Sequence, residues 1–158
     1  MDNKERNEII LKVTCELLEK MNVEVEEAFV EDREGEDEEE QVLVGVKVGN
    51  PAGLIGFKGR NLASTQMVLA MMVKNKLGRW VRVLLDVNNY RDEQKRRLEK
   101  IVETLAEKVR QTGESAELPK MSSYERRICH MRAADLEGVV TESEGEEEER
   151  HVVIKPKV

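Results

Sequence analysis

The chain has 158 residues, which is enough for one medium-sized domain or two small ones, and its net charge is −7. Hydrophobic residues make up 39% of the sequence and charged residues 37%, so the core is modest and the solvated surface is large. No apolar run approaches the roughly 18 residues of a membrane-spanning helix, and residues 1–8 are too polar for a signal peptide. We therefore expect a cytoplasmic protein with no membrane span.

Apolar periodicity predicts a first group of elements before residue 88. The clearest strand is residues 42–48, where four valines alternate with other residues. A helix is expected from about Asn61, as its N-cap, to Lys76, with Met67 and Met72 among its core positions. The other expected elements are a helix over 5–21, a strand over 23–31, an acidic hairpin loop over 32–40, a helical turn over 53–56 and a strand over 80–87.

A second group of elements follows two asparagines at 88–89, which we take as the boundary between two domains, 1–88 and 89–158. An amphipathic helix is expected over 90–112, ended by Gly113. The remaining expected elements are an extended link over 114–119, a helix over 122–135, and a closing hairpin of 139–143 and 151–154 with its turn around Gly145. The alternation of helices with short strands predicts an α+β protein.

Charge is distributed unevenly along the chain. Residues 1–50 carry a net charge of −10, residues 51–135 carry +7, and residues 136–158 carry −4. Screening limits electrostatic interactions to roughly 8–10 Å, so a basic middle segment can attract phosphate on a protein that is acidic overall. The charge pattern therefore keeps nucleic acid among the candidate ligands. Aromatic residues make up only 3% of the sequence, which limits stacking on bases.

Two cysteines, Cys15 and Cys129, are too few for a disulfide framework, and there is no C-x-x-C spacing. We expect both to be reduced thiols, with Cys15 buried on the first helix. Cys129 is adjacent to His130, but neighbouring residues of a helix point about 100° apart, so this pair predicts no metal site. No cofactor is predicted.

Residues 53–62 read GLIGFKGRNL and contain a G-x-x-G loop at 56–59. Two glycines three residues apart allow a tight turn and the close approach of a ligand backbone. The N-terminus of the following helix favours an anion, and Lys58 and Arg60 add positive charge. The spacing fits neither a Rossmann fingerprint nor a P-loop. Glycines in such a loop can also serve the turn alone, and that reading stays open.

With two strands before this loop and one after it, residues 5–88 resemble a KH domain of the type II topology. That family clamps about four nucleotides of single-stranded nucleic acid at the G-x-x-G loop. The resemblance implies that Gly56, Phe57, Lys58 and Gly59 hold phosphates above an apolar floor that includes Ile55 and Leu62. Phe57 departs from the pattern, because close relatives usually carry polar or basic residues inside the loop.

Arg126 and His130 are four residues apart on a predicted helix and therefore share a face. A guanidinium and an imidazole on one face can both donate to phosphate oxygens. An exposed polar helix face that carries an incidental histidine is the alternative interpretation. Arg127 and Lys120 are nearby in the sequence and are further candidates.

The string PKMSSYERRICH at 119–130, followed by TESEG at 141–145 and RHVVI at 150–154, is similar to an R-3-H domain, which binds single-stranded polynucleotides. A KH domain followed by an R-3-H domain resembles the Jag, or KhpB, family of bacterial RNA-binding proteins over nearly the whole chain. Many members carry an extra N-terminal domain, which we expect to be absent here. The resemblance also implies a link to cell elongation and division and a small KH partner protein.

We therefore expect a single-stranded RNA-binding protein that regulates gene expression after transcription, and no enzyme, because neither histidine lies in a catalytic motif. Two weak sites on one chain can raise joint affinity by ~10²–10⁴. Single-stranded DNA and a homodimer stay open as further partners. The alternative function is a protein-interaction module that uses the KH fold as a dimerisation or scaffold surface. The predicted nucleic-acid-binding residues are Gly56, Phe57, Lys58, Gly59, Arg60, Lys120, Arg126, Arg127 and His130.

Overall fold

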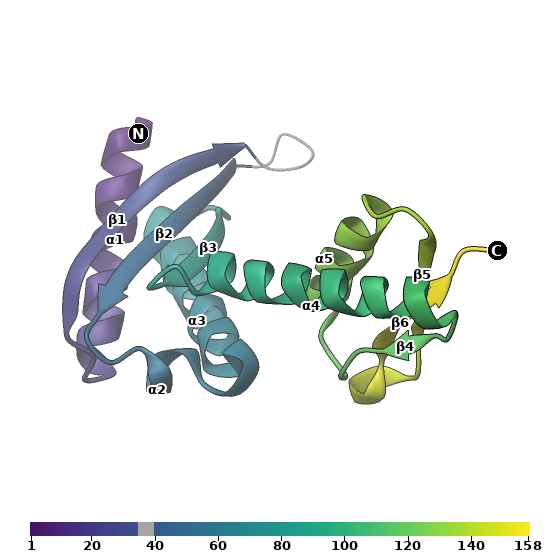
Figure 1. Cartoon of the computed structure of the whole chain (residues 1–158). Coiled ribbons are helices and arrows are strands. Elements are labelled where there is room, and N and C mark those ends of the chain that lie inside the picture. Colours follow the sequence, from purple (N-terminus) through teal and green to yellow (C-terminus); the bar gives the residue numbers. More distant parts are fainter. Residues whose placement is uncertain (35–39) are drawn as a thin grey trace. The chain divides into compact units, whose positions relative to one another are not determined.

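The computed structural model describes residues 1–34 and 40–158, which form two compact units, residues 1–91 and 92–158 (Figure 1). Each unit combines helices with a sheet of three strands, which confirms the predicted α+β class. No helix within the described ranges is both long and apolar enough to cross a membrane.

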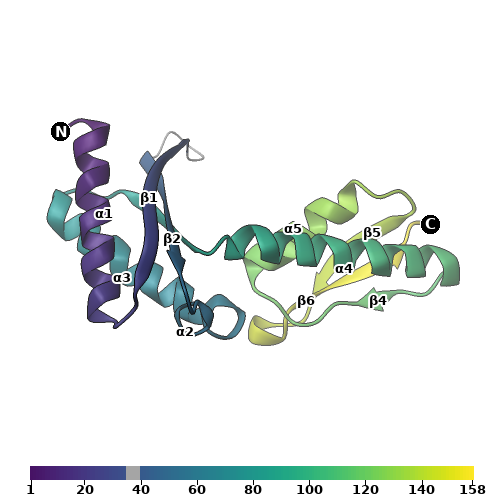
Figure 2. The same cartoon turned by 60° about the vertical axis from the view of Figure 1, so that its left-hand side comes forward.

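The first unit is a three-stranded sheet with helices against it. β2 is the central strand, antiparallel to β1 and parallel to β3. Figure 2 shows α1 and α3 on the same side of the β1–β2 pair. The elements are α1 (Asn3–Lys20), β1 (Val25–Glu34), β2 (Glu40–Val48), α2 (Ala52–Ile55), the 3₁₀ turn η2 (Phe57–Gly59), α3 (Arg60–Leu77) and β3 (Arg82–Val87).

The alternating valines of β2 supply the centre of the core of the first unit. Val42, Val44, Val46 and Val48 are all buried, which confirms the predicted strand, because successive side chains of a strand point to opposite faces. α1 contributes Ile10 among its buried residues, and these apolar side chains form one cluster with buried residues of α3 and β3.

The second unit is a smaller sheet whose central strand is β6, paired with β4 on one side and β5 on the other. β5 and β6 are antiparallel, which confirms the predicted closing hairpin. Val152 and Ile154 of β6 join a core cluster with residues of α4 and α5. The elements are α4 (Tyr90–Thr112), β4 (Ala116–Glu117), α5 (Ser123–Ala134), β5 (Val139–Glu144), the 3₁₀ turn η3 (Glu147–Glu149) and β6 (His151–Pro156).

Two expected core positions are wrong. Cys15 is exposed, and Cys129 is the buried cysteine, because the buried stripe of α1 passes through Val13 and Thr14 and leaves Cys15 outside. Met67 is 68% exposed, because the buried stripe of α3 contains Leu62, Thr65, Leu69 and Val73. Both helices have more apolar residues than positions that face the sheet, so some of these residues are exposed to solvent.

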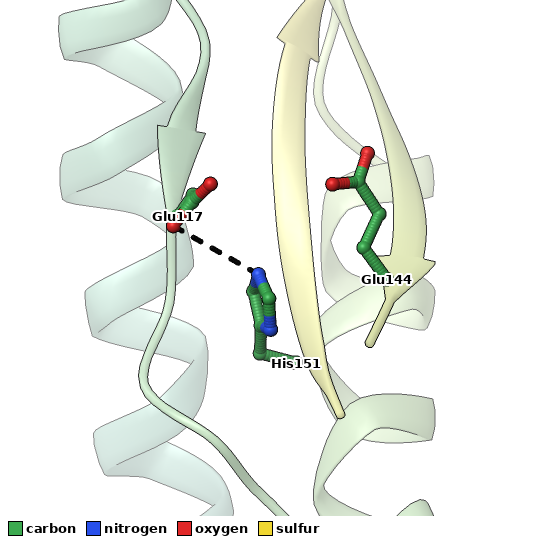
Figure 3. Close-up of side chains that lie close together, drawn as sticks. All are labelled: Glu117, Glu144 and His151. Carbon is green, nitrogen blue, oxygen red and sulfur yellow. Dashed lines mark ion pairs between the residues drawn. The ribbon is translucent and has the colours of Figure 1, made fainter. Parts of the chain in front are cut away.

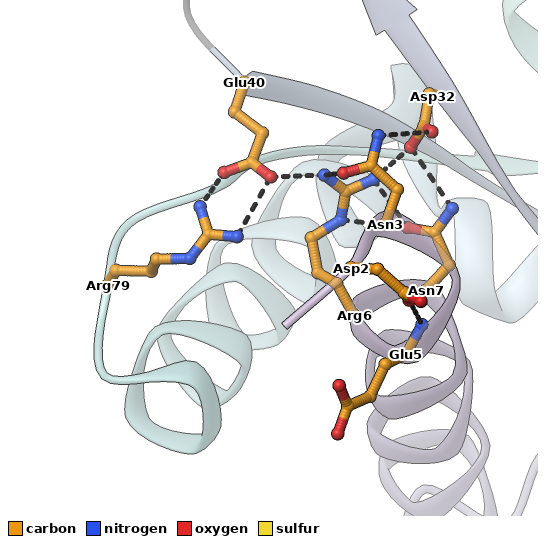
Figure 4. Close-up of polar contacts among 8 residues, drawn as sticks. All are labelled: Asp2, Asn3, Glu5, Arg6, Asn7, Asp32, Glu40 and Arg79. Atoms are coloured by element: carbon orange, nitrogen blue, oxygen red, sulfur yellow. Dashed lines mark hydrogen bonds and ion pairs between the residues drawn. The ribbon is translucent and has the colours of Figure 1, made fainter.

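The acidic hairpin loop expected over 32–40 is shorter than predicted. β1 continues to Glu34 and β2 begins at Glu40, and the two residues pair with each other; residues 35–39 lie outside the described part of the chain. Acidic residues are depleted in strands, but here the buried side chain of Arg6 forms ion pairs with Asp32 and Glu40. Arg79 also pairs with Glu40, so one cation on α1 and one before β3 hold these strand ends (Figure 4).

Arg6→Met should destabilise the first unit, because it leaves the Asp32 and Glu40 carboxylates without their shared buried cation. We expect a loss of about 2 kcal/mol, below the roughly 3–5 kcal/mol of a fully buried pair, since both carboxylates are partly exposed. Urea unfolding measures this loss in the free energy of unfolding. Arg33→Met is the matched control, because the Arg33–Glu31 pair is exposed on both sides; an equal loss in both variants would contradict the role of Arg6.

Because of the contacts of Asp32, the free energy of unfolding of the first unit should depend on pH in the acid range. A hydrogen bond from Asn7, with the charge of Arg6, lowers the pKa of the Asp32 carboxyl below its usual value. This contribution is fully present above the unfolded-state pKa and is lost as the pH falls through the lower folded-state pKa. The free energy of unfolding should therefore fall less steeply in acid for Asp32→Asn than for wild type. Parallel acid profiles for the two proteins would contradict this expectation.

Candidate nucleic-acid interface

The G-x-x-G loop of the first unit is a tight turn between α2 and α3. Gly56 has φ 70° and ψ −175°, and Gly59 has φ 77°, which are conformations that glycine adopts at little cost. Lys58 between them has φ 52°. Three residues with positive φ reverse the chain between Gly56 and α3.

Asn61 holds this loop rather than capping α3, so its predicted capping role is wrong. α3 begins at Arg60, and its N-cap is Gly59. The Asn61 side chain instead donates a hydrogen bond from Nδ2 to the Gly53 carbonyl oxygen, at 2.8 Å. A Cβ atom on Gly56 would lie 2.5 Å from the Asn61 Cγ atom. The glycine at 56 is therefore required by both its backbone angles and the close approach of Asn61.

The tip of the loop presents one ring and two cations. Phe57 is 72% exposed. The Lys58 Nζ atom lies 5.6 Å from the centre of the Phe57 ring, and the Arg60 guanidinium carbon lies 6.0 Å from it. These distances suit cation–π contact. Leu62 is only 3% exposed, so it belongs to the core and is not an accessible part of the expected apolar floor.

In the second unit, the start of α5 positions Arg126. Ser122 and Glu125 form a capping box, in which each side chain accepts a hydrogen bond from the other residue's backbone N–H. The Arg126 guanidinium donates from Nη1 to the Met121 carbonyl oxygen at 2.8 Å and from Nη2 to Ser123 Oγ at 3.3 Å. A guanidinium has five N–H donors, so these two bonds orient it without using its full capacity.

His130, one turn further along α5, contacts two hydroxyls of β5. Its Nδ1 atom lies 2.7 Å from Thr141 Oγ1, and its Nε2 atom lies 2.7 Å from Ser143 Oγ. Both ring nitrogens therefore have partners within the protein. The ring therefore orients the hydroxyls of Thr141 and Ser143.

The charges of two arginines act on the His130 ring. Burial lowers the pKa of His130 below its usual value, and the positive charges of Arg126 and Arg150 lower it further. The imidazole is therefore neutral at pH 7, and the positive charge of the site comes from the two arginines. A hollow of about 740 Å³ lies beside it, and His130, Thr141 and Lys157 are among its lining residues.

The structure thus brings together Arg126 and His130 of the predicted set and adds three residues that the sequence analysis missed. Thr141 and Ser143 are on β5 and Arg150 directly precedes β6, 11 to 24 positions away from Arg126 and His130. Their sequence signal was present in the strings TESEG and RHVVI, which matched the R-3-H pattern as a whole without assigning roles to single residues.

Lys120 and Arg127 are less closely associated with this group. Lys120 is exposed and forms an ion pair with Glu149 at 2.9 Å. Arg127 is exposed and follows Arg126 directly on α5, so its side chain leaves the helix about 100° away. Gly56, Phe57, Lys58, Gly59 and Arg60 belong to the first unit and form a separate surface.

Comparison with known proteins finds similarity over most of the chain. A family model described as the R-3-H domain matches residues 96–156. The chain is 39% identical over 119 residues to a protein of Clostridium symbiosum, 30% identical over 109 residues to one of Streptococcus pneumoniae, and 33% identical over 106 residues to one of Bacillus subtilis. Each of these three is named RNA-binding protein KhpB.

These matches cover 75%, 69% and 66% of this chain, respectively. They cover 54%, 33% and 51% of the three relatives. The chain therefore spans about half the length of two of these relatives and a third of the other.

The electrostatic arrangement around His130 predicts how the ring titrates. The pKa of His130 should lie below that of an ordinary histidine, and Arg126→Gln should raise it, because one repelling charge is removed. An NMR pH titration of the imidazole carbon-bound protons measures both values. Lys108→Gln, which removes an exposed charge from α4, is the matched control and should leave the midpoint unchanged. A midpoint that responds equally to both variants would show that Arg126 does not face the ring.

Proposed function

Because this chain is a homologue of the KhpB (Jag) proteins and contains an R-3-H domain at residues 96–156, we propose that it binds single-stranded RNA through two surfaces. The observation that carries the proposal is the group formed by Arg126, His130 and Arg150 inside the matched R-3-H range. Two guanidinium groups beside a neutral ring and two hydroxyls suit the phosphate backbone of a nucleic acid.

In the R-3-H domain, each residue of the group has a distinct task. Arg126 and Arg150 supply the charge and the planar forks that match phosphate oxygens. His130 holds the hydroxyls of Thr141 and Ser143, each at 2.7 Å from a ring nitrogen. A hydroxyl can donate or accept by rotating, so Thr141 and Ser143 can address a phosphate oxygen or a ribose hydroxyl. Lys120 and Arg127 extend the positive surface along the start of α5.

For the first unit, we propose a type II KH domain over residues 1–88. The order helix, two strands, two helices, strand supports it, as does the position of the G-x-x-G turn before α3. Phosphates would lie against Gly56, Lys58, Gly59 and Arg60, where glycines allow close approach and the N-terminus of α3 favours an anion. The exposed ring of Phe57 would stack on a base, since stacking tolerates any base.

Two such surfaces on one chain would act additively on a single RNA strand. Linking two weak sites raises the effective concentration of the second, and joint affinity can exceed either alone by ~10²–10⁴. We further propose a non-catalytic, cytoplasmic regulator that acts after transcription, and that needs no cofactor. The link to cell elongation and division, the binding of single-stranded DNA, and a small KH partner protein are parts of this proposal that rest on the family resemblance.

A second candidate function is protein association through α3. Met67, Val68 and Met71 are 68%, 46% and 61% exposed, and residues three to four apart share one face of a helix. Apolar side chains that gather on one exposed face are typical of interaction surfaces. This stripe supports the alternative of a KH fold used for dimerisation or scaffolding, which is compatible with RNA binding elsewhere on the domain.

Fluorescence anisotropy with a short mixed-sequence single-stranded RNA tests the primary proposal. Affinity for RNA should fall steeply as salt rises, because each neutralised phosphate releases counterions. Lys58→Asp and Arg126→Glu should each weaken binding by about tenfold at low salt and reduce the salt dependence. Lys12→Asp and Lys108→Glu are matched controls, since each reverses an exposed charge, on α1 and α4, that belongs to neither proposed surface.

Four results decide between the surfaces. Weaker binding in both variants, with the controls at wild-type affinity, supports two RNA contacts. If only one variant weakens binding, the other surface has another role. Equal losses in variants and controls would mean that only net charge matters. Failure of the wild type to bind RNA saturably at low salt would reject the proposal and favour the α3 stripe, which sedimentation of wild type and Met71→Glu then tests.

A further inference from the structure

The second sheet has one face against the helices and one face that carries charged residues. Val152 and Ile154 of β6 belong to the core, so His151 points to the opposite face, because side chains alternate along a strand. Glu144 of β5 pairs directly with His151. Glu117 of β4 pairs with Val153, which is two residues from His151 and shares its face. The register therefore gathers three side chains from three strands.

These three side chains point toward one another. One ligand atom of each of Glu117, Glu144 and His151 lies within 4.8 Å of the other two. The His151 Nε2 atom lies 3.9 Å from Glu117 Oε2 (Figure 3). This group is on the face opposite to the one that carries Thr141 and Ser143, since those residues pair with the core residues Ile154 and Val152. It is therefore separate from the proposed RNA surface.

The hydrogen bonds of His151 determine which ring nitrogen has a free lone pair. Its Nδ1 atom lies 3.0 Å from the Glu149 carbonyl oxygen. A carbonyl oxygen only accepts, so Nδ1 carries the proton and Nε2 of the neutral ring does not. The Nε2 atom is buried, and it has no hydrogen-bond partner within the described residues. A buried acceptor without a donor is unfavourable, and a metal ion at this position would satisfy it.

We propose that Glu117, Glu144 and His151 form a binding site for a divalent transition-metal ion, with Zn²⁺ as the best match. One imidazole nitrogen and two carboxylate oxygens are donors that Zn²⁺ accepts, and a water molecule would complete a tetrahedral site. The hydrogen bond from Nδ1 to a backbone carbonyl is the orientation that metal-bound histidines commonly have.

Rotation of the two glutamate side chains would bring the three ligand atoms within bonding distance of one metal ion. Zn²⁺ binds these atoms at about 2.0–2.2 Å, so the ligand atoms must approach one another more closely than 4.8 Å. Glu117 is 71% exposed and Glu144 is 44% exposed, so both side chains have room to rotate. Glu144 also pairs through Oε1 with Lys155 at 3.1 Å, which leaves Oε2 for the metal.

A bound ion would join the three strands of the second sheet. β4 has only two residues, and its strand pairing with β6 involves Ala116 and Glu117. An ion held by Glu117, His151 and Glu144 would connect β4 to β6 and β5. Because a ligand that binds only the folded state stabilises it, Zn²⁺ should raise the temperature of thermal unfolding.

Isothermal titration of the full chain with Zn²⁺ tests this site. The protein carries Cys15→Ser throughout, because Cys15 is an exposed thiol that could bind the metal by itself. Glu117→Gln is the main variant, since its exposed side chain can change without unfolding the sheet, and His151→Gln is the second. Glu103→Gln is the matched control, because Glu103 is an exposed carboxylate on α4 that pairs with Arg132 at 2.8 Å and not with Lys155.

We expect the parent protein to bind one Zn²⁺ per chain, and Glu117→Gln and His151→Gln each to weaken binding by at least about tenfold. Glu103→Gln should bind as the parent does. Thermal unfolding should show a Zn²⁺-dependent rise in the parent and the control, and a smaller rise in the two variants. Equal affinities in Glu117→Gln and Glu103→Gln, or no saturable Zn²⁺ binding by the parent, would overturn the proposal.

Discussion

The antiparallel register of β5 and β6 is the constraint on which the second unit depends. Strand alternation sends Thr141 and Ser143 toward the face that α5 covers, where they meet His130. The same alternation sends Glu144 and His151 to the other face. A slip of one residue would exchange these faces and separate both groups at once. Val152 and Ile154 oppose such a slip, since it would remove them from the core that they form with α4 and α5.

The first unit likewise depends on a few polar side chains that stabilise particular segments of its backbone. Three residues of the loop adopt positive φ, two of them glycines, and the bond from Asn61 to the Gly53 carbonyl oxygen holds the start of this turn. At the far end of the same sheet, Arg6 neutralises two acidic strand ends. In each case a polar side chain stabilises a segment of backbone next to an exposed surface. Asn61 does so at the G-x-x-G loop, and Arg6 does so at the ends of β1 and β2.

Local pattern predicted most helices and strands, because burial of one face imposes a period on the sequence. The four valines of β2 and the long helix α4 are clear cases. The predictions failed where a contact distant in sequence decides the outcome. Residues 32–34 extend β1 because Arg6 pairs with Asp32, and Met67 and Cys15 are exposed because the sheets cover only one stripe of α3 and α1.

By itself, the sequence determined the α+β class, the G-x-x-G turn and the Arg126–His130 pair, because each depends on residues fewer than about five positions apart. Only the tertiary structure placed Arg150, Thr141 and Ser143 around His130, and only strand register brought Glu117, Glu144 and His151 together. Thr141, Ser143 and Arg150 lie 11 to 20 positions from His130, and Glu117, Glu144 and His151 lie 7 to 34 positions from one another. Their proximity comes from the pairing of β4, β5 and β6, which depends on how the whole second core packs.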